Sequence, residues 1–217
     1  MMKLYQFENC PYCEKTRLGL EEKGIAYQKI EVPYHKREEV LCLSGQKLVP
    51  VIADGEVIVA DSPLIADYLE EKYPEPALYP GGRAMHKLIE EWADFELARD
   101  PLLLAFPEWY HSLKDPAEAA FFKEDKEKRN APFAVLRERA PKYLRRFRSH
   151  LAYLEEILSQ RDCLLGAFGQ ADISVYAQLW TYRRLCGEDV FRDFPAVSRW
   201  QERVESRHER RREPLAA

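Results

Sequence analysis

The chain has 217 residues, of which 46% are apolar, and its 33 Lys and Arg against 37 Asp and Glu give a net charge of −4. This length and apolar content suffice for two compact units or one large one. The slight acidity excludes a global basic field for nucleic acid or anionic lipid. No stretch reaches the ~20 apolar residues of a membrane span, and the start lacks the apolar region of a signal peptide. We therefore expect a cytoplasmic protein that binds neither nucleic acid nor membrane.

The first forty residues alternate between strand and helix patterns. Residues 3–7 predict a short strand, residues 12–23 a helix that stops at Gly24, and the alternating residues 26–31 a second strand. Strand, helix and strand at this spacing predict a parallel βαβ unit. The charged segment 34–40 that follows predicts a short, irregular helix.

A Cys-Pro-Tyr-Cys box, Cys10 to Cys13, lies between the first strand and the first helix. A cysteine at a helix N-terminus faces unpaired backbone N–H groups, and the thiolate is the form that attacks a disulfide. The pKa of Cys10 is therefore predicted to fall to roughly 3.5 to 7.5. Cys13, about one helical turn further along, is placed to resolve a mixed disulfide, and Pro11 suits a first turn that needs no N–H.

The alternative for two cysteines at this spacing is half of a zinc site or a pair of buried thiols. Zinc needs two more ligands, and Cys42, Cys163 and Cys186 form no second pair. Five cysteines also argue against a disulfide framework and favour a reducing compartment. No metal is expected, because no metal-ligand spacing connects the five histidines, His35, His86, His111, His150 and His208.

A hairpin and another helix come next. Residues 49–52 and 57–60 are apolar runs on either side of the turn dipeptide Asp54-Gly55. The segment 61–63 then begins a helix, with Ser62 predicted as its N-cap and Pro63 as its first residue. Pro74 is predicted to end that helix.

This order of elements, with a Cys-x-x-Cys box after the first strand and Val49-Pro50 before the third, resembles the thioredoxin fold. The resemblance implies that Pro50 is a cis-proline and that the backbone of Val49 faces the active cysteine. An extended peptide would then add to the sheet edge by hydrogen bonds to Val49.

The stretches 45–50, 60–69 and 73–74 narrow the resemblance to the N-terminal domain of the glutathione transferase superfamily. It implies that Asp61 and Ser62 hold the γ-glutamyl end of glutathione, because a helix N-terminus binds a carboxylate and a nearby acid binds the amine. Aspartate here replaces the glutamate of many members, and an ordinary helix cap is the alternative. The resemblance also implies glutathione contacts from Val49, Pro50 and Tyr12. It implies a cation for the glycine carboxylate of glutathione, and Lys47 is preferred over Lys36 or Arg37. The alternative is that these cations form only a solvated face.

Residues 74–82 contain three prolines and two glycines and predict a linker, after which strand patterns stop. Apolar spacing predicts helices from residue 84 to a break near Pro107, over 121–130 and 135–158, and around residues 173–180 and 197–204. The predicted fold is a thioredoxin-like α/β domain (1–76), a linker (77–83) and an all-α domain (84–217), the glutathione transferase architecture.

Two features of the helical half are assigned through the same resemblance or through composition. The segment 169–173 matches the superfamily's helix-capping segment, with Gly169 where serine or threonine is usual, so Asp172 is predicted to be a folding residue that reaches back to free N–H groups. Trp109, Tyr110 and Trp180 either line an acceptor pocket between the domains or belong to the core.

The cysteine pair favours one activity within the superfamily. Members with an active cysteine, such as omega-class transferases and two-domain bacterial glutaredoxins, tend to form a mixed disulfide with glutathione. The leading hypothesis is therefore a glutathione-dependent thiol–disulfide oxidoreductase that uses Cys10 and Cys13, with glutathione as cosubstrate and a disulfide as second substrate.

Two alternatives stay open. Conjugation of glutathione to an electrophile would use a neighbouring hydroxyl such as Tyr5 or Tyr12. A non-catalytic interaction protein would use the fold as a scaffold, although such members tend to lose the cysteine pair or the glutathione pocket. A homodimer is a further possibility, because transferases of this fold are commonly dimers whereas two-domain glutaredoxins resemble monomers.

Overall fold

A computed structural model describes residues 1–212, with side chains described as far as residue 208. The N-terminal half contains a mixed four-stranded sheet in the order β2-β1-β3-β4, in which β1 runs parallel to β2 and the other pairs are antiparallel. Its elements are β1 (Met2–Gln6), α1 (Pro11–Glu22), β2 (Tyr27–Glu31), α2 (Glu38–Ser44), β3 (Val51–Asp54), β4 (Val57–Ala60) and α3 (Ser62–Lys72). The predicted thioredoxin-like fold class is confirmed.

The C-terminal half is helical throughout, as predicted. It consists of α4 (Arg83–Trp92), a π-helical turn (Ala93–Leu97), α5 (Arg99–Ser112), α6 (Pro116–Arg129), α7 (Phe133–Glu138), α8 (Ala140–Leu158), α9 (Gln170–Cys186), a 3-10 turn (Asp189–Asp193) and α10 (Pro195–Arg212). None of the helices between residues 1 and 212 combines the length and the apolar character that a membrane span requires.

Three predicted boundaries were wrong. The second helix begins at Glu38 rather than near residue 34. Asp61, not Ser62, is the N-cap of α3, because its φ of 80° is outside the helical range and the helix begins at Ser62. Pro107 does not end its helix: α5 continues to Ser112, and the buried Phe106 and Trp109 beside the proline supply packing that offsets the lost hydrogen bond.

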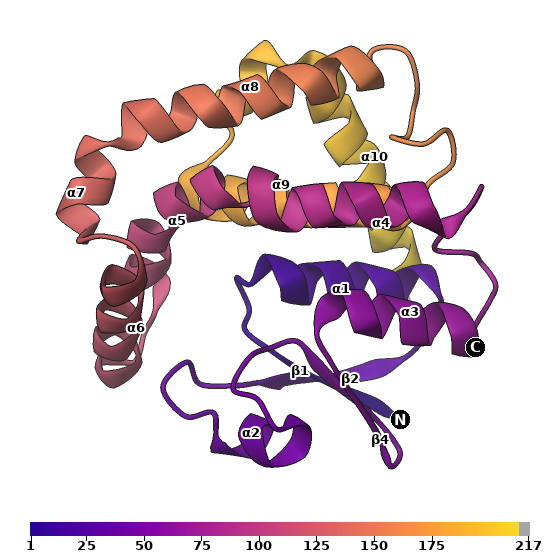
Figure 1. Cartoon of the computed structure of the whole chain (residues 1–217), viewed down its shortest axis with the longest axis horizontal. Helices are drawn as coiled ribbons and strands as arrows, with labels where there is room; N and C mark the ends of the chain where they lie inside the picture. Colours follow the sequence, from indigo (N-terminus) through magenta and orange to yellow (C-terminus); the bar gives the residue numbers. More distant parts are fainter. Residues whose placement is uncertain (213–217) are drawn as a thin grey trace.

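Helix α1 lies between the sheet and the helical half (Figure 1). It packs against α3 on one side and against α9 and α10 on the other. Every residue of α1 except Tyr12 is buried, so its charged side chains need partners inside the molecule. Lys15 Nζ lies 2.5 Å from Asp94 Oδ2 and 3.1 Å from Glu90 Oε1, both in the helical half. The two halves are therefore joined across α1 by charge pairing as well as by apolar packing.

The start of α9 shows why glycine replaces serine or threonine at position 169. His86 donates through Nε2 to the carbonyl of Pro80 at 3.0 Å, so its Nδ1 accepts from the backbone N–H of Ala171 at 3.1 Å. A Cβ atom on Gly169 would lie 2.7 Å from His86 Cε1 and 2.6 Å from the carbonyl oxygen of Leu78. His86 thus takes the place of the missing cap hydroxyl and occupies the space that a side chain at residue 169 would need.

Asp172 completes this capping arrangement from within α9. Its carboxylate accepts from the backbone N–H groups of Leu164, at 3.0 Å, and Gly169, at 3.4 Å. The indole N–H of Trp200 in α10 donates to the same carboxylate at 2.9 Å. Asp172 reaches back to the free N–H of Gly169, as predicted, and it also holds α10 in place.

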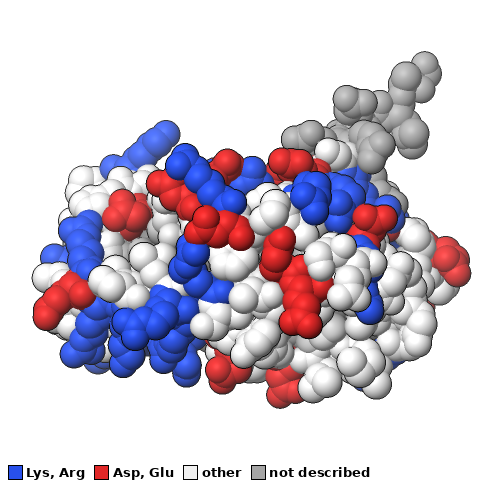
Figure 2. Space-filling model, turned by 90° about the horizontal axis from the view of Figure 1, so that it is seen from above, with Lys and Arg blue, Asp and Glu red and all other residues white. Residues whose placement is uncertain are grey.

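The outer face of the helical half carries both signs of charge (Figure 2). Lys and Arg side chains gather toward the end where α7 meets α8, and Asp and Glu are interspersed over the rest of this face. Within the basic segment of α8, Arg146 and Arg148 pair with Asp100 and Asp193. Much of this basic character is therefore neutralised within the molecule.

Gly169→Ser, which restores the usual cap residue, is expected to destabilise the protein by about 1–3 kcal/mol because its Cβ meets backbone and an imidazole ring. Urea unfolding, followed by circular dichroism, measures the difference in free energy. Gly19→Ala is the matched control, since its nearest contact would be Leu69 Cδ1 at 3.8 Å. A Gly169→Ser protein as stable as the unmodified one would contradict this account.

Candidate active site

Cys10 is the N-cap residue of α1, and Pro11 occupies the first helical position. Cys10 is 6% exposed, whereas Cys13 is fully buried, and both are free thiols. Because Pro11 has no N–H, the first free backbone donors of the helix are those of Tyr12 and Cys13. The box therefore directs two N–H groups and one neighbouring thiol toward the sulfur of Cys10.

The pKa values of the two thiols of the box are shifted in opposite directions. Burial by itself raises the pKa of Cys10, but the Cys13 thiol, the N–H groups of Cys13 and Tyr12, and the charge of Arg17 outweigh burial and lower that pKa below its ordinary value. Burial, together with the hydrogen bond to Cys10 and its charge, raises the pKa of Cys13 well above the ordinary value. Cys10 is thus the more acidic thiol of the pair, and the Cys13 thiol stabilises its charged form as a hydrogen-bond donor.

Val49 lies beside the cysteine box, and its peptide bond to Pro50 is cis, as the resemblance implied. Cys10 and Val49 line one cavity of about 200 Å³, which we call the thiol cavity. In the part of the chain that the structure describes, no residue hydrogen-bonds to the backbone N–H or carbonyl of Val49. Both groups are available to an extended peptide.

A second cavity of about 570 Å³, which we call the acidic cavity, adjoins the first, and both are lined by Tyr12, Leu48 and Val49. Its remaining walls come from the start of α3 and from α4 and the π-helical turn of the other half. Four acids and one cation line it, namely Asp61, Glu90, Glu91, Asp94 and Lys87. Such a wall suits the ammonium end of a zwitterionic ligand.

Asp61 lines the acidic cavity, and the buried Ser62 follows it as the first residue of α3. Asp61 is the only described residue other than glycine with a positive φ, a conformation that costs about 1–3 kcal/mol, and its N–H donates to the carbonyl of Pro50 at 3.2 Å. The hydroxyl of Ser62 is buried, and no described residue hydrogen-bonds to it. A strained acid beside an unpartnered buried hydroxyl, at a helix N-terminus, fits the binding of a carboxylate and an amine.

The cation predicted for the glycine carboxylate of glutathione is Lys47. Lys47 is exposed and is not among the residues that line either cavity, although its neighbours Gln46 and Leu48 line the acidic one. Lys87, which no sequence pattern indicated, lines the acidic cavity instead, and it pairs with Asp67 and Glu90 at 2.9 Å. Arg37, the weaker alternative, lines the thiol cavity.

Tyr12 joins the two cavities, but its hydroxyl has a structural partner. It donates to the backbone carbonyl of Asp94 at 3.1 Å, and burial, together with the charges of Asp94, Cys10 and Asp61, raises the pKa of Tyr12. The neighbouring Tyr5 is buried in β1 and lies outside the lining of both cavities.

The three aromatic residues considered for an acceptor pocket lie in different surroundings. Trp109 lines the thiol cavity and is also buried in the core, so its assignment to an acceptor pocket stays a prediction. Tyr110 packs against Phe133, and Trp180 lies beneath the guanidinium of Arg17, so both belong to the core or its margin.

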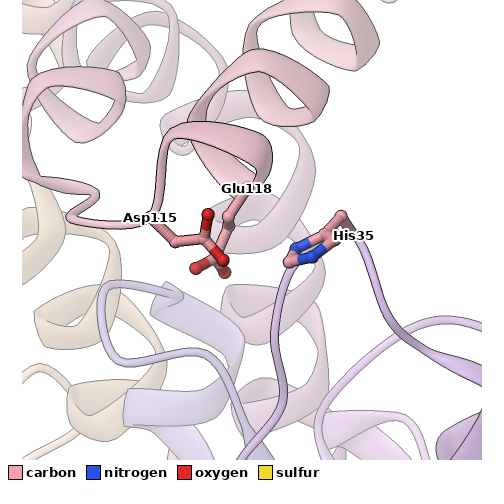
Figure 3. A group of neighbouring side chains, drawn as sticks. All are labelled: His35, Asp115 and Glu118. Carbon is pink, nitrogen blue, oxygen red and sulfur yellow. The ribbon is translucent and has the colours of Figure 1, made fainter.

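A group that the sequence analysis missed brings His35 together with Asp115 and Glu118, whose ligand atoms all lie within 4.8 Å of one another. Figure 3 shows the imidazole facing the two carboxylates across the gap between the halves. Both acids already have structural partners, since Asp115 caps α6 through the N–H of Ala117 and Glu118 accepts from the backbone N–H of Tyr34 at 2.5 Å. We assign this group to contact between the halves, because Glu118 binds the backbone of Tyr34 across them and Asp115 caps α6.

Comparison with known proteins identifies the fold family. The models for the N-terminal and the C-terminal domain of glutathione S-transferases match residues 4–77 and 117–203. The chain belongs to the glutathione S-transferase superfamily. Among solved structures, glutaredoxin 2 of Salmonella typhimurium in complex with glutathione has a TM-score of 0.79 and 20% identity over 96% of this chain and 95% of that one. A glutathione transferase of Phanerochaete chrysosporium has a TM-score of 0.83 and 22% identity over 95% and 96%.

The curated relatives point to several functions within the superfamily. A stringent starvation protein A homolog of Haemophilus influenzae is 26% identical over 95% of this chain and 87% of its own length. A maleylpyruvate isomerase of Ralstonia sp is 37% identical, over 36% of this chain and 39% of the isomerase. The family is thus established for the chain, whereas its reaction depends on the site.

The lowered pKa of Cys10 predicts selective alkylation. Iodoacetamide should modify Cys10 faster than the exposed Cys42 in mildly acidic buffer, with a midpoint below the ~8.5 of an ordinary cysteine. Cys13→Ala, which removes the hydrogen bond to Cys10, should move the midpoint upward, whereas Cys13→Ser should move it less. Mass spectrometry of each cysteine across a pH series measures both effects, and equal rates for Cys10 and Cys42 at acidic pH would contradict the assignment.

Proposed function

We propose that this protein is a glutathione-dependent thiol–disulfide oxidoreductase. The observation that carries the proposal is Cys10, a thiol of lowered pKa at a helix N-terminus that lines the thiol cavity, while Val49 and Tyr12 line both this cavity and the acidic one. A nucleophilic sulfur between a cavity suited to glutathione and a second cavity is the arrangement that exchange between two thiol partners requires.

Glutathione is assigned to the acidic cavity. Its cysteinyl backbone would pair with the free N–H and carbonyl of Val49, and its γ-glutamyl end would lie against Asp61 and Ser62. This pose directs the glutathione sulfur toward Cys10, because Val49 lines both cavities. The chemistry of these groups, rather than any bound ligand, supports the assignment.

The reaction then proceeds in two exchanges. The Cys10 thiolate attacks the glutathionyl sulfur of a mixed disulfide GS–S–R, which forms Cys10–S–SG and releases R–S⁻, protonated by solvent. The thiolate of a second glutathione attacks the glutathionyl sulfur of this enzyme disulfide, which forms GS–SG and returns Cys10 as a thiolate. In sum, GS–S–R and GSH give GS–SG and RSH. Cys13 takes part where the substrate is a protein disulfide.

Conjugation of glutathione to electrophiles finds less support among the hydroxyls near the site. The Tyr12 hydroxyl already donates to the backbone carbonyl of Asp94, so this donor is not free to stabilise a glutathione thiolate. A scaffold role is the second candidate, because the relative that matches most of both chains, the stringent starvation protein A homolog, is not named for an enzyme activity. A glutathione-affinity column distinguishes the scaffold role from the proposed enzyme, since a scaffold without a glutathione site should flow through.

The proposal predicts different effects for the two cysteines. Cys10→Ser should reduce glutathione-dependent turnover of a small mixed disulfide to the uncatalysed rate, since no other nucleophile replaces the thiolate. Cys13→Ser should keep that activity within roughly tenfold, because only the acidity of Cys10 is affected. Coupling to glutathione reductase measures both, with Cys42→Ser as the control. Activity retained by Cys10→Ser would refute the proposal.

A homodimer is proposed as well, from apolar side chains left exposed beside the acidic cavity. Leu64 of α3, Leu88 of α4 and Phe95 of the π-helical turn are 57%, 60% and 71% exposed, and Lys87 Nζ donates to the carbonyl of Pro63, which brings the two helices together. Sedimentation equilibrium should give twice the mass of the chain, and Leu88→Glu should shift the protein toward monomer. A monomer at high concentration would contradict the proposal.

A further inference from the structure

The acidic cavity and the thiol cavity, which share Tyr12, Leu48 and Val49, have opposite electrostatic character. The acidic cavity has four acids and one cation in its wall. The thiol cavity has three cations, Arg37, Lys126 and Arg129, and no Asp or Glu among the described residues that line it. Since glutathione is assigned to the acidic cavity, the positive charge faces the other substrate.

Arg37 is a buried cation that lacks a carboxylate partner. It is 9% exposed, and it donates to two backbone carbonyls, those of Tyr34 at 2.7 Å and Lys47 at 3.4 Å. Its Nη2 is buried, and no described residue accepts a hydrogen bond from it. The guanidinium lies over the rings of Tyr34, at 4.0 Å, and Phe7, at 5.2 Å. A buried, charged donor without a partner is costly, which indicates that a ligand accepts from it.

Lys126 on α6 is in a similar position. Its ammonium lies 4.7 Å from the ring centroid of Phe106 and 5.2 Å from that of Tyr34. The one carboxylate near it, Asp125, is 4.0 Å away and is bound more closely by Arg129 and by the Tyr34 hydroxyl. Aromatic rings stabilise a cation less than a carboxylate does once water is removed, so Lys126 keeps a large part of its desolvation cost.

Arg129 contributes less to this charge, because it is exposed and pairs with Asp125. The uncompensated charge of the cavity therefore comes from two side chains, one from each half of the molecule. The apolar wall beside them includes Phe7, Phe106 and Trp109. A cavity of about 200 Å³ with this lining accepts a small group that has a short apolar stem and an anionic end.

We propose that the second substrate carries an anionic group, such as a carboxylate, which binds between Arg37 and Lys126. This inference rests on the proposed function and specifies its leaving thiol: in GS–S–R, the group R is a small organic anion. The two cations then hold R–S⁻ as it leaves, since the sulfur of R begins next to Cys10 and its charge develops in the same positive cavity.

The titration of Lys126 supplies a second readout. Burial, followed by the charge of Arg129, lowers the pKa of Lys126 to about 8, with Asp125 and Cys10 acting in the opposite direction and Arg37 in the same direction. Lys126 is thus charged below this pH and neutral above it. Preference for an anionic over a neutral substrate should decline as the pH rises through about 8, while Arg37 retains part of it. Ionisation of Cys10 and of glutathione affects both substrates equally and cancels in the ratio.

The test uses the full chain and three disulfides of similar size, those of mercaptoethanol, mercaptopropionate and cysteamine, which are neutral, anionic and cationic. Each forms its mixed disulfide with glutathione in the assay. For each we compare kcat/KM of the unmodified protein with that of Lys126→Gln, so that intrinsic differences between the leaving thiols cancel. Lys126→Gln should lower the anionic-to-neutral ratio by about tenfold, the scale expected for loss of one charged hydrogen-bond donor.

Two further variants control the interpretation. Lys126→Arg keeps the charge and should retain the preference. Lys128→Gln removes an equal charge from an exposed position of α6 outside the cavity lining and should leave the ratio unchanged. Unfolding of each variant by urea confirms that the changes act on the site rather than on folding.

Four results would overturn the inference. An anionic-to-neutral ratio unaffected by Lys126→Gln would remove Lys126 from substrate recognition. A rise in the KM for glutathione that is equal for all three disulfides would assign the cation to the glycine carboxylate of glutathione instead. Absence of turnover with every disulfide in the unmodified protein would refute the proposed function, and this inference with it, whereas turnover without charge preference would refute the inference alone.

Discussion

Lys15 in α1 lies among the carboxylates of the helical half, 2.5 Å from Asp94 and 3.1 Å from Glu90. A charge this deeply buried is tolerated only with partners, and removing one member of such a group commonly costs about 3–5 kcal/mol. The contact sets where α1 sits relative to α4, and α1 carries Cys10 at its first turn. The walls of both cavities around Cys10 therefore depend on an interaction that takes no part in the chemistry.

The same pairing shapes the electrostatics of the acidic cavity. Lys15 and Lys87 lower the pKa of Glu90 against the effect of burial, whereas burial raises the pKa of Asp94 even beside Lys15. The cavity thus keeps negative character next to Asp61, while the positive side chains Arg37 and Lys126 lie beyond Cys10. The Cys10 thiol lines the positive cavity, and Tyr12, Leu48 and Val49 connect that cavity to the acidic one.

The lowered pKa of Cys10 arises from its immediate surroundings. Against burial, which raises this pKa, the hydrogen bond with the Cys13 thiol lowers it most, followed by the backbone N–H groups of Cys13 and Tyr12 and then by the charge of Arg17. The sulfur replaces the oxygen of an ordinary N-cap residue, and the proline after it removes an N–H that would have no partner. The Cys-Pro-Tyr-Cys sequence thereby places a thiol of lowered pKa and a thiol of raised pKa within one turn of helix.

How much of this was predictable depends on the range of the interactions. The sequence by itself determined the βαβ unit, the hairpin and the place of Cys10 at the start of α1, because strand alternation, Gly24, Asp54-Gly55 and the cysteine box act over a few residues. It also placed Asp172 correctly as a capping residue. Only the tertiary structure decided that His86 caps α9 across 85 residues, that α5 continues through Pro107, and that Arg37 and Lys126 share one cavity. The physical reason is that these features depend on packing between segments far apart in the sequence, among them α6, α4 and the loop before α2. No local sequence pattern encodes such packing.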